Sequence, residues 1–352
     1  MPIALSPALR SQLHPNADVD TSAPRAATRT REAPAATTSP TAALVHYTYT
    51  DKSEAAVRAR LERYRDGYSG PYFVAGARVV APAQFRMVGG FNDANAGCVV
   101  VHGAPHADPK NARLRELLEV CSRAHLPYPG RCLMGCPEGH ELARVTQALI
   151  DAGKLPAGDA SLPDRIKSLQ WHYGIGIDCT DYVLGAALAA HGQRERDVAI
   201  RSFGVALPAP GIDYFATATT NPHLQRVEVA AARAGDVFCL DDPGSVGHRA
   251  VVYERHVCGD DELSALRAKF GSDCSAFFVG GAVHQIEVDS SWGAGDQGAS
   301  YGGVRRDTWL FNASTGAWAQ LDKRVSADSE PVFRQTGRGP AGEVLRGIFR
   351  FK

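Results

Sequence analysis

The feature that most constrains the fold lies in the second half of the chain, where one apolar helical segment precedes a series of short alternating runs. The helix is expected over residues 181–191. The runs, which are typical of strands, cover residues 237–240, 249–255, 276–279, 283–288 and 308–311. A helix followed by neighbouring short strands favours an antiparallel sheet with the helix packed on one face. The sequence therefore predicts an α+β fold.

The first half of the chain has a different character. Residues 1–43 are rich in Ala, Pro, Thr and Ser without an apolar period, which indicates a disordered leader. Beyond the leader, apolar spacing predicts helices over residues 53–65, 111–124 and 141–152, and strands over residues 72–80 and 97–102. We therefore predict three regions: a leader of residues 1–43, a helical N-terminal accessory region of residues 44–165, and a main domain of residues 166–352.

Composition excludes several classes of partner. Lys and Arg total 38, as do Asp and Glu, so the net charge is zero and bulk electrostatics favours neither nucleic acid nor an anionic membrane. No apolar run reaches the length of a membrane span. The N-terminus lacks the pattern of a secretory signal, so we expect a cytoplasmic protein or a non-classical export route. Eight dispersed cysteines favour reduced thiols over a disulfide scaffold, and we expect no cofactor.

Cys179 raises the main functional question of the sequence. It stands where a glycine-spaced apolar run turns into the predicted helix, and Asp178 beside it suits a helix cap. Backbone N–H groups and the dipole at a helix start favour an anion and so lower a thiol pKa. Cys179 is therefore either a core residue or a nucleophile with a lowered pKa.

A cysteine nucleophile needs a base, and His248 has the best position among the twelve histidines. It follows a turn-rich stretch and begins a strand on which His248, Ala250 and Val252 face one way. A side chain at such a strand mouth can face a cleft. The alternative is an ordinary, half-exposed polar residue at a strand end.

Five segments in a fixed order carry a resemblance to a known family. They are G176-I-D-C-T-D-Y-V183, R233-A-G-D-V-F238, G247-H-R-A-V-V-Y253, I286-E-V-D-S-S291 and G302-G-V-R305. Together, over about residues 170–310, they resemble the NlpC/P60 family of papain-like cysteine peptidases. The resemblance implies a papain-like core in which a nucleophile-bearing helix packs on an antiparallel sheet. It also implies Cys179 as nucleophile and His248 as general base and acid.

The resemblance also implies a third polar residue that orients the histidine. Asp289 best fits that position, although the family often has a histidine there. Glu287 and His284 compete for the role, with Glu287 and Asp289 on one face of the strand and His284 on the other. A carboxylate suits the role because it fixes the imidazole tautomer and stabilises the imidazolium.

The implied function is hydrolysis of a peptide or isopeptide amide through a thioester, with bacterial cell-wall peptides as the substrate class. One alternative is a secreted bacterial effector that deamidates or acylates a host protein through the same thioester. Another is a non-enzymatic binding module on the same fold. The insertion before Arg233 and the charged excursion over residues 257–275 depart from the family pattern and concern the substrate groove.

Two further sets of residues have competing interpretations. Cys121, Cys132, Cys136 and His140 have residue types that suit zinc, but their spacing is loose and lacks paired C-x2-C knuckles. The favoured interpretation is a glycine- and proline-rich loop with incidental thiols, and we expect no metal. Tyr173 and Tyr128 are candidates for the tyrosine that lines the family's cleft, with simple packing as the alternative.

Overall fold

The computed structural model describes residues 52–86, 109–127, 129–192, 215, 218–241, 247–270, 278–292, 302–321 and 344–352. By compactness the chain divides into residues 1–48 and residues 49–352, and all described residues belong to the second unit. The expected leader, residues 1–43, and the expected strand 97–102 lie outside the described residues.

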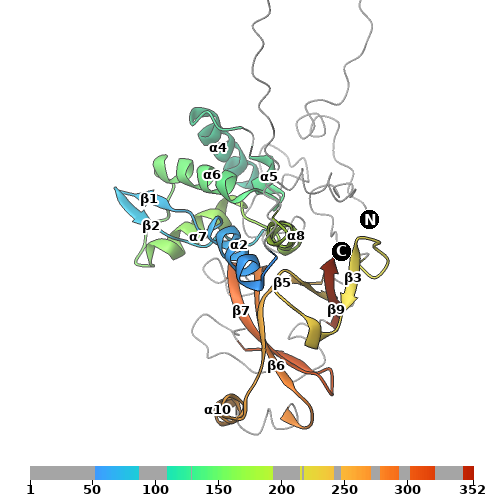
Figure 1. The fold of residues 1–352 in the computed structure, drawn as a ribbon. Helices are drawn as coiled ribbons and strands as arrows, with labels where there is room; N and C mark the ends of the chain where they lie inside the picture. Colours follow the sequence, from blue (N-terminus) through green and yellow to red (C-terminus); the bar gives the residue numbers. More distant parts are fainter. Residues whose placement is uncertain are drawn as a thin grey trace, which may run out of the picture. The chain divides into compact units, whose positions relative to one another are not determined.

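The described residues form a mixed fold of helices and antiparallel strands, so the predicted α+β class is confirmed (Figure 1). The helices are α2 (Glu54–Asp66), α4 (Pro109–Arg123), α5 (Gly130–Leu133), α6 (Gly139–Asp151), α7 (Leu162–Tyr173), α8 (Cys179–Ala190) and α10 (Asp260–Phe270). The strands are β1 (Tyr72–Val74), β2 (Ala77–Val79), β3 (Leu224–Val227), β4 (Val237–Asp241), β5 (Arg249–Val257), β6 (Val283–Trp292), β7 (Gly303–Asn312), β8 (Trp318–Gln320) and β9 (Val344–Phe351).

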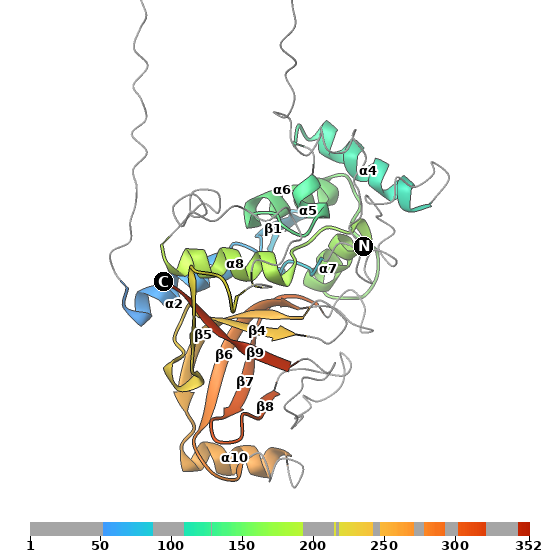
Figure 2. The same cartoon turned by 90° about the vertical axis from the view of Figure 1, so that its right-hand side faces the viewer.

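A seven-stranded antiparallel sheet dominates the fold, in the order β3-β9-β4-β5-β6-β7-β8. Helix α8 lies across one end of this sheet and α10 lies at the opposite end (Figures 1 and 2). The last strand, β9, inserts between β3 and β4, so the C-terminal segment completes the sheet. Sequence reasoning missed β3, β8 and β9, and it predicted β6 and β7 too short.

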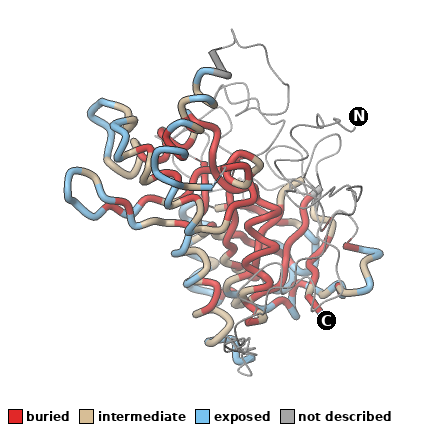
Figure 3. Tube along the Cα trace, turned by 90° about the horizontal axis from the view of Figure 1, so that it is seen from above, coloured by how far each residue is buried: buried red, intermediate tan, exposed pale blue. Residues whose placement is uncertain are grey.

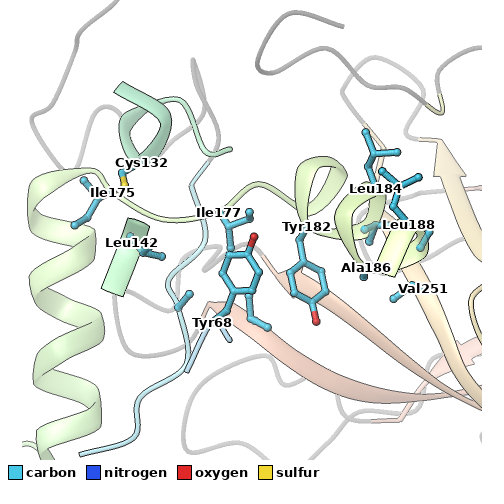
Figure 4. Close-up of a cluster of buried hydrophobic side chains, with 14 of the residues drawn as sticks. Tyr68, Cys132, Leu142, Ile175, Ile177, Tyr182, Leu184, Ala186, Leu188 and Val251 are labelled. Atoms are coloured by element: carbon cyan, nitrogen blue, oxygen red, sulfur yellow. The ribbon is translucent and has the colours of Figure 1, made fainter. Parts of the chain in front are cut away.

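Two cores lie on the two faces of the sheet. The helix-side core joins α8 to the sheet and includes Tyr182, Ala186, Leu188 and Val251 (Figure 4). The far-side core contains only side chains from the sheet region, among them Phe238, Ala250, Val252, Val288, Trp292 and Trp309. Nearly every residue of α8 is buried. Buried residues gather in the middle of the described part of the chain, and exposed residues lie at its periphery (Figure 3). Successive residues of β5 therefore pack in different cores: Val251 lies in the helix-side core, and its neighbours Ala250 and Val252 lie in the far-side core.

The N-terminal helices follow the sequence closely. Helices α2, α4 and α6 confirm the three predicted helices, and Ser53 caps α2 by accepting from the Ala56 N–H. The run 72–80 is a hairpin rather than one strand, because Ala75 and Gly76 adopt positive φ and turn the chain between β1 and β2. A strand was expected over residues 276–279. Residues 278 and 279 are not in a strand, so the prediction is wrong for these two residues, and residues 276 and 277 lie outside the described residues.

The helical region and the sheet share a core. Tyr64 of α2 lies so close to Gly185 of α8 that a Cβ on the glycine would stand 1.9 Å from the tyrosine hydroxyl. Arg60 donates two hydrogen bonds to the Ala190 carbonyl at the end of α8. The expected boundary between residues 165 and 166 falls inside α7, and the division into two regions there stays a prediction. None of the described helices is long and apolar enough to cross a membrane.

Candidate active site

The loop before Cys179 is held by backbone contacts with two other segments of the chain. Ile177 pairs with Phe85 in an isolated parallel bridge, with its N–H donating to the Gln84 carbonyl at 2.9 Å. The Asp178 N–H donates to the Gly135 carbonyl at 2.7 Å. Gly176 permits this close approach, because a Cβ there would lie 2.3 Å from the Gln84 carbonyl oxygen. The segment that carries the cysteine is thus fixed before the helix begins.

Cys179 is the first residue of α8. Asp178 is its N-cap and accepts from the Thr180 N–H at 2.8 Å, so the predicted capping role is confirmed. The Cys179 sulfur lies 3.9 Å from the Thr180 hydroxyl and accepts a hydrogen bond from the Arg249 backbone N–H. The sulfur therefore meets the start of β5, one residue after His248.

Burial controls the ionisation of Cys179. The residue is 5% exposed, and this loss of hydration raises the pKa of its thiol well above the ordinary value. The neighbouring carboxylate of Asp178 raises the pKa further, while the Arg249 N–H lowers it in part. The expected lowering of the pKa by the helix start is thus wrong for this arrangement, because desolvation outweighs the favourable N–H groups.

His248 faces the other core. Its ring stacks on Trp292 with centroids 4.1 Å apart and planes at 28°. The predicted alternation holds, since Ala250 and Val252 belong to the same far-side core as Trp292. Within the described residues, the hydrogen-bond partners of the Cys179 sulfur are Thr180 and Arg249, and His248 is not one of them. The N–H of the residue after His248 is thus bonded to the sulfur, while the ring of His248 stacks on Trp292.

Asp289 belongs to a buried ion-pair network. Its carboxylate is fully buried and accepts both arms of Arg306, at 2.8 and 2.9 Å, while Arg65 of α2 lies 3.7 Å away. Asp289 stands opposite Val251 in the β5–β6 register, three positions along β5 from His248. Among the described residues, its partners are these two arginines. The contacts join the sheet to α2 rather than to the His248 ring.

The two competitors for the third role also have other partners. Glu287 lies 3.7 Å from Arg306 on the same face as Asp289, as the alternation predicted. Nδ1 of His284 lies 3.1 Å from Arg255, and burial lowers the pKa of His284. No direct contact joins Glu287 or His284 to Cys179 among the described side chains.

Two serines at the end of β6 are the residues that sequence reasoning missed. Ser291 donates to the Ile177 carbonyl at 2.7 Å, and Ser290 donates to the Arg249 carbonyl at 2.6 Å. Both serines are fully buried. They tie the cysteine loop and the start of β5 to the same strand end. The two serines directly follow Asp289 in the sequence, but only the folded structure shows that their hydroxyls bond to the Arg249 and Ile177 carbonyls.

A cationic side chain, Arg305 of β7, lies beside the Trp292 ring of the stacked pair. The Arg305 guanidinium lies 5.5 Å from the Trp292 ring centroid and pairs with Asp307 at 2.8 Å. Burial, and then the charge of Arg305, lowers the pKa of Lys167 to about 8.

The alternative zinc set does not assemble. Cys121, Cys132 and Cys136 are buried, whereas His140 is exposed. No three of these four residues bring their ligand atoms within 4.8 Å of one another. Burial raises the pKa of Cys121 to about 11, as expected for a thiol in an apolar core.

The two tyrosines proposed for the cleft have different outcomes. Tyr173 ends α7 with its ring in the helix-side core, and its hydroxyl donates to Glu116 at 2.6 Å. These contacts account for Tyr173 by packing. Tyr128 lies outside the described residues.

Comparison with known proteins adds no assignment: the chain matches no family model, no curated protein sequence and no solved structure. The functional interpretation therefore rests on the residues and contacts above.

Proposed function

We propose that this protein is a cysteine hydrolase with a papain-like core of the NlpC/P60 kind, which cleaves a peptide or isopeptide amide with Cys179 as nucleophile and His248 as base. The observation that carries the proposal is the position of the Cys179 sulfur, at the first residue of α8 and on the N–H of the residue that follows His248. A Cys-His pair requires the two side chains within hydrogen-bond reach, and this backbone contact brings the residue next to His248 to the sulfur.

The reaction would begin with transfer of the Cys179 thiol proton to His248. The thiolate attacks the amide carbonyl, and the oxyanion accepts from the Cys179 backbone N–H, which has no intrahelical acceptor in the first turn of α8. The imidazolium gives its proton to the leaving amine. A water molecule, deprotonated by the same imidazole, then hydrolyses the thioester and regenerates the thiol.

This sequence of steps requires His248 to leave Trp292. We propose that the ring turns from the stack toward the sulfur when substrate binds, because the N–H of the residue after His248 is already bonded to Cys179. Buried Cys179 stays protonated until then. The resting arrangement thus protects the thiol from oxidation and from unselective electrophiles.

The contacts favour a Cys-His dyad over a triad with Asp289. Arg306 occupies both oxygens of Asp289, so the carboxylate supports the fold. We propose that stacking against Trp292 defines the inactive position of the imidazole, and that Asp289 acts on catalysis only through the stability of the sheet.

The substrate class is proposed from the family resemblance: peptides of the bacterial cell wall. The test is incubation of the purified chain with such peptides, followed by mass spectrometry, with Cys179→Ala as the control. Cleavage that depends on Cys179 supports the proposal. A mass change of one unit on a protein side chain, or a transferred acyl group, would instead identify the deamidase or acyltransferase alternative.

One observation favours a second candidate, a non-enzymatic binding module on the same fold. The Cys179 thiol is buried and its pKa is raised, as in a core residue. A binding module would keep this state in the presence of any peptide. Reaction of Cys179 with an electrophilic peptide therefore separates the two candidates.

A further inference from the structure

Three side chains with metal-binding atoms gather where β5 passes into α10. They are His256, Cys258 and Glu262, and their imidazole nitrogen, sulfur and carboxylate oxygen all lie within 4.8 Å of one another. Among the described residues, no other group of three His, Cys, Asp or Glu side chains brings its ligand atoms this close together. The group lies at the end of the sheet opposite α8 (Figures 1 and 2).

Local structure explains why these three residues meet. His256 and Cys258 are two positions apart on extended chain, so both side chains project to one side, and the Cys258 N–H extends the β5–β6 pairing by donating to Val283 at 2.8 Å. Glu262, in the first turn of α10, folds back over them. One of its oxygens accepts from the Gly259 N–H at 2.8 Å, and the other lies 3.0 Å from Nε2 of His256.

We propose that His256, Cys258 and Glu262 form a binding site for a divalent transition metal of the zinc type. Imidazole, thiolate and carboxylate are the protein ligands of zinc, and three of them leave a fourth position for water. Bonds of about 2.0–2.3 Å in a tetrahedron separate ligand atoms by about 3.3–3.7 Å. The present cluster reaches that geometry through side-chain shifts of about 1 Å.

The charges around the cluster suit a cation. Coordination releases the Cys258 thiol proton to solvent, so thiolate and carboxylate together balance a doubly charged ion. The ion replaces the hydrogen bond between His256 and Glu262. Asp260 and Asp261 in the same first turn of α10 add negative charge without contributing to the cluster.

The position of the cluster separates the ion from the proposed chemistry at Cys179. His256 and Cys258 lie seven and nine positions along the chain from Arg249, where β5 meets Cys179, a distance of about 23–30 Å at the usual rise of a strand. Cys258 packs in a small core with Phe278 and Leu310, against which Leu263 and Leu266 of α10 also pack. A bound ion would clamp α10 onto this core and leave the chemistry at Cys179 unaffected.

Titration of the metal-free full-length chain with Co²⁺ tests the site directly. We expect one equivalent of Co²⁺ to produce a thiolate-to-cobalt charge-transfer band in the near ultraviolet, and Zn²⁺ to abolish it by displacement. Cys258→Ser should lose the band. His256→Ala should weaken Zn²⁺ binding by at least about tenfold, since even outer-shell changes commonly cost that much.

Asp261→Asn is the matched control. It removes one negative charge from the same helical turn but no ligand atom, so Zn²⁺ affinity should stay within about twofold of the original chain. Zn²⁺ should raise the unfolding temperature of the original chain and of Asp261→Asn, but not that of His256→Ala. Because His256 is partly exposed, His256→Ala is expected to fold even if Cys258→Ser does not.

Three results would overturn the proposal. One is the absence of a thiolate band in the original chain. Another is a band of full intensity in Cys258→Ser, which would place the cobalt on other cysteines. The third is equal Zn²⁺ affinity of His256→Ala and Asp261→Asn, which would reduce the cluster to an ordinary ion pair.

Discussion

The two faces of the main sheet differ in what they bury. The helix-side face carries the charged network of Asp289 and Arg306 together with the end of α8 that holds Cys179. The far-side face is aromatic, with Trp292, Trp309 and the ring of His248 in contact. Cys179 thus lies with the charged helix-side face and accepts from the Arg249 N–H, whereas the ring of His248 stacks in the aromatic far-side face. The comparison teaches that neighbouring residues of one chain segment can serve different faces: the Arg249 N–H bonds to Cys179, while the ring of His248 packs on Trp292.

The largest expected effect concerns the charged face. Asp289→Ala should lower the free energy of unfolding by about 3–5 kcal/mol, because it leaves Arg306 without its buried bidentate partner. Urea unfolding followed by circular dichroism measures the change. Glu287→Gln is the control: Glu287 contacts the same arginine but is partly exposed, so its loss should cost no more than about 1 kcal/mol. Equal losses in the two variants would contradict the assigned network.

The next effect is the pH dependence of stability that Cys179 contributes. The pKa of this thiol is raised in the folded chain, so the folded state retains its proton above about pH 8.5, where an unfolded cysteine ionises. Unfolding then releases a proton, and stability falls with rising pH by up to about 1.4 kcal/mol per unit for this group. The stability is fully present below about pH 8.5.

Cys179→Ser should therefore reduce the fall in unfolding free energy between about pH 8.5 and pH 10 by up to about 2 kcal/mol, relative to the original chain. Cys132 and Cys121 titrate in both proteins and cancel in the difference. Parallel stability curves of the two proteins would show that the Cys179 pKa is not raised.

A smaller effect tests whether the aromatic face restrains the base. Removal of the stack by Trp292→Ala should let His248 reach the sulfur and speed iodoacetamide labelling of Cys179 by about tenfold, equivalent to about 1.4 kcal/mol. The double variant Trp292→Ala with His248→Ala controls for simple exposure of the thiol, and it should lose most of the gain. The same gain in both variants would mean that Trp292 merely covers Cys179.

The smallest effect concerns Ser291, whose hydroxyl donates to the loop before Cys179. Ser291→Ala removes the hydrogen bond to the Ile177 carbonyl and should cost about 1 kcal/mol of unfolding free energy, since Ile177 keeps its bond from the Arg86 N–H. Thermal unfolding measures the loss. A cost near 3 kcal/mol would indicate that the serine holds more of the cysteine loop than this single bond.

Local patterns predicted the elements near the site. Asp178 before an apolar run signals a capped helix, and the alternation of His248, Ala250 and Val252 placed these residues on one face. The α+β class followed from the helix and strands of the second half. Helix α7 carried a readable start as well, with Ser161 as its cap and Pro163 in the first turn, but its apolar spacing is weak.

Long-range pairing explains what the sequence could not predict. Nothing in residues 344–351 indicates that β9 inserts between β3 and β4, because that choice depends on strands more than a hundred residues away. The alternation of β5 likewise does not reveal which face meets α8. Asp289 could be assigned to Arg306 only through the β6–β7 register.

The most direct test of the proposed Cys-His hydrolase is covalent trapping with an electrophilic peptide. The chain should be incubated with a peptidyl vinyl sulfone near neutral pH, and the modified residue and its rate should be determined by mass spectrometry. We predict a single adduct at Cys179, formed about a hundredfold more slowly in His248→Ala, since general-base assistance contributes at least about that factor. No adduct at Cys179, or an equal rate in His248→Ala, would contradict the proposal and favour the non-enzymatic binding module.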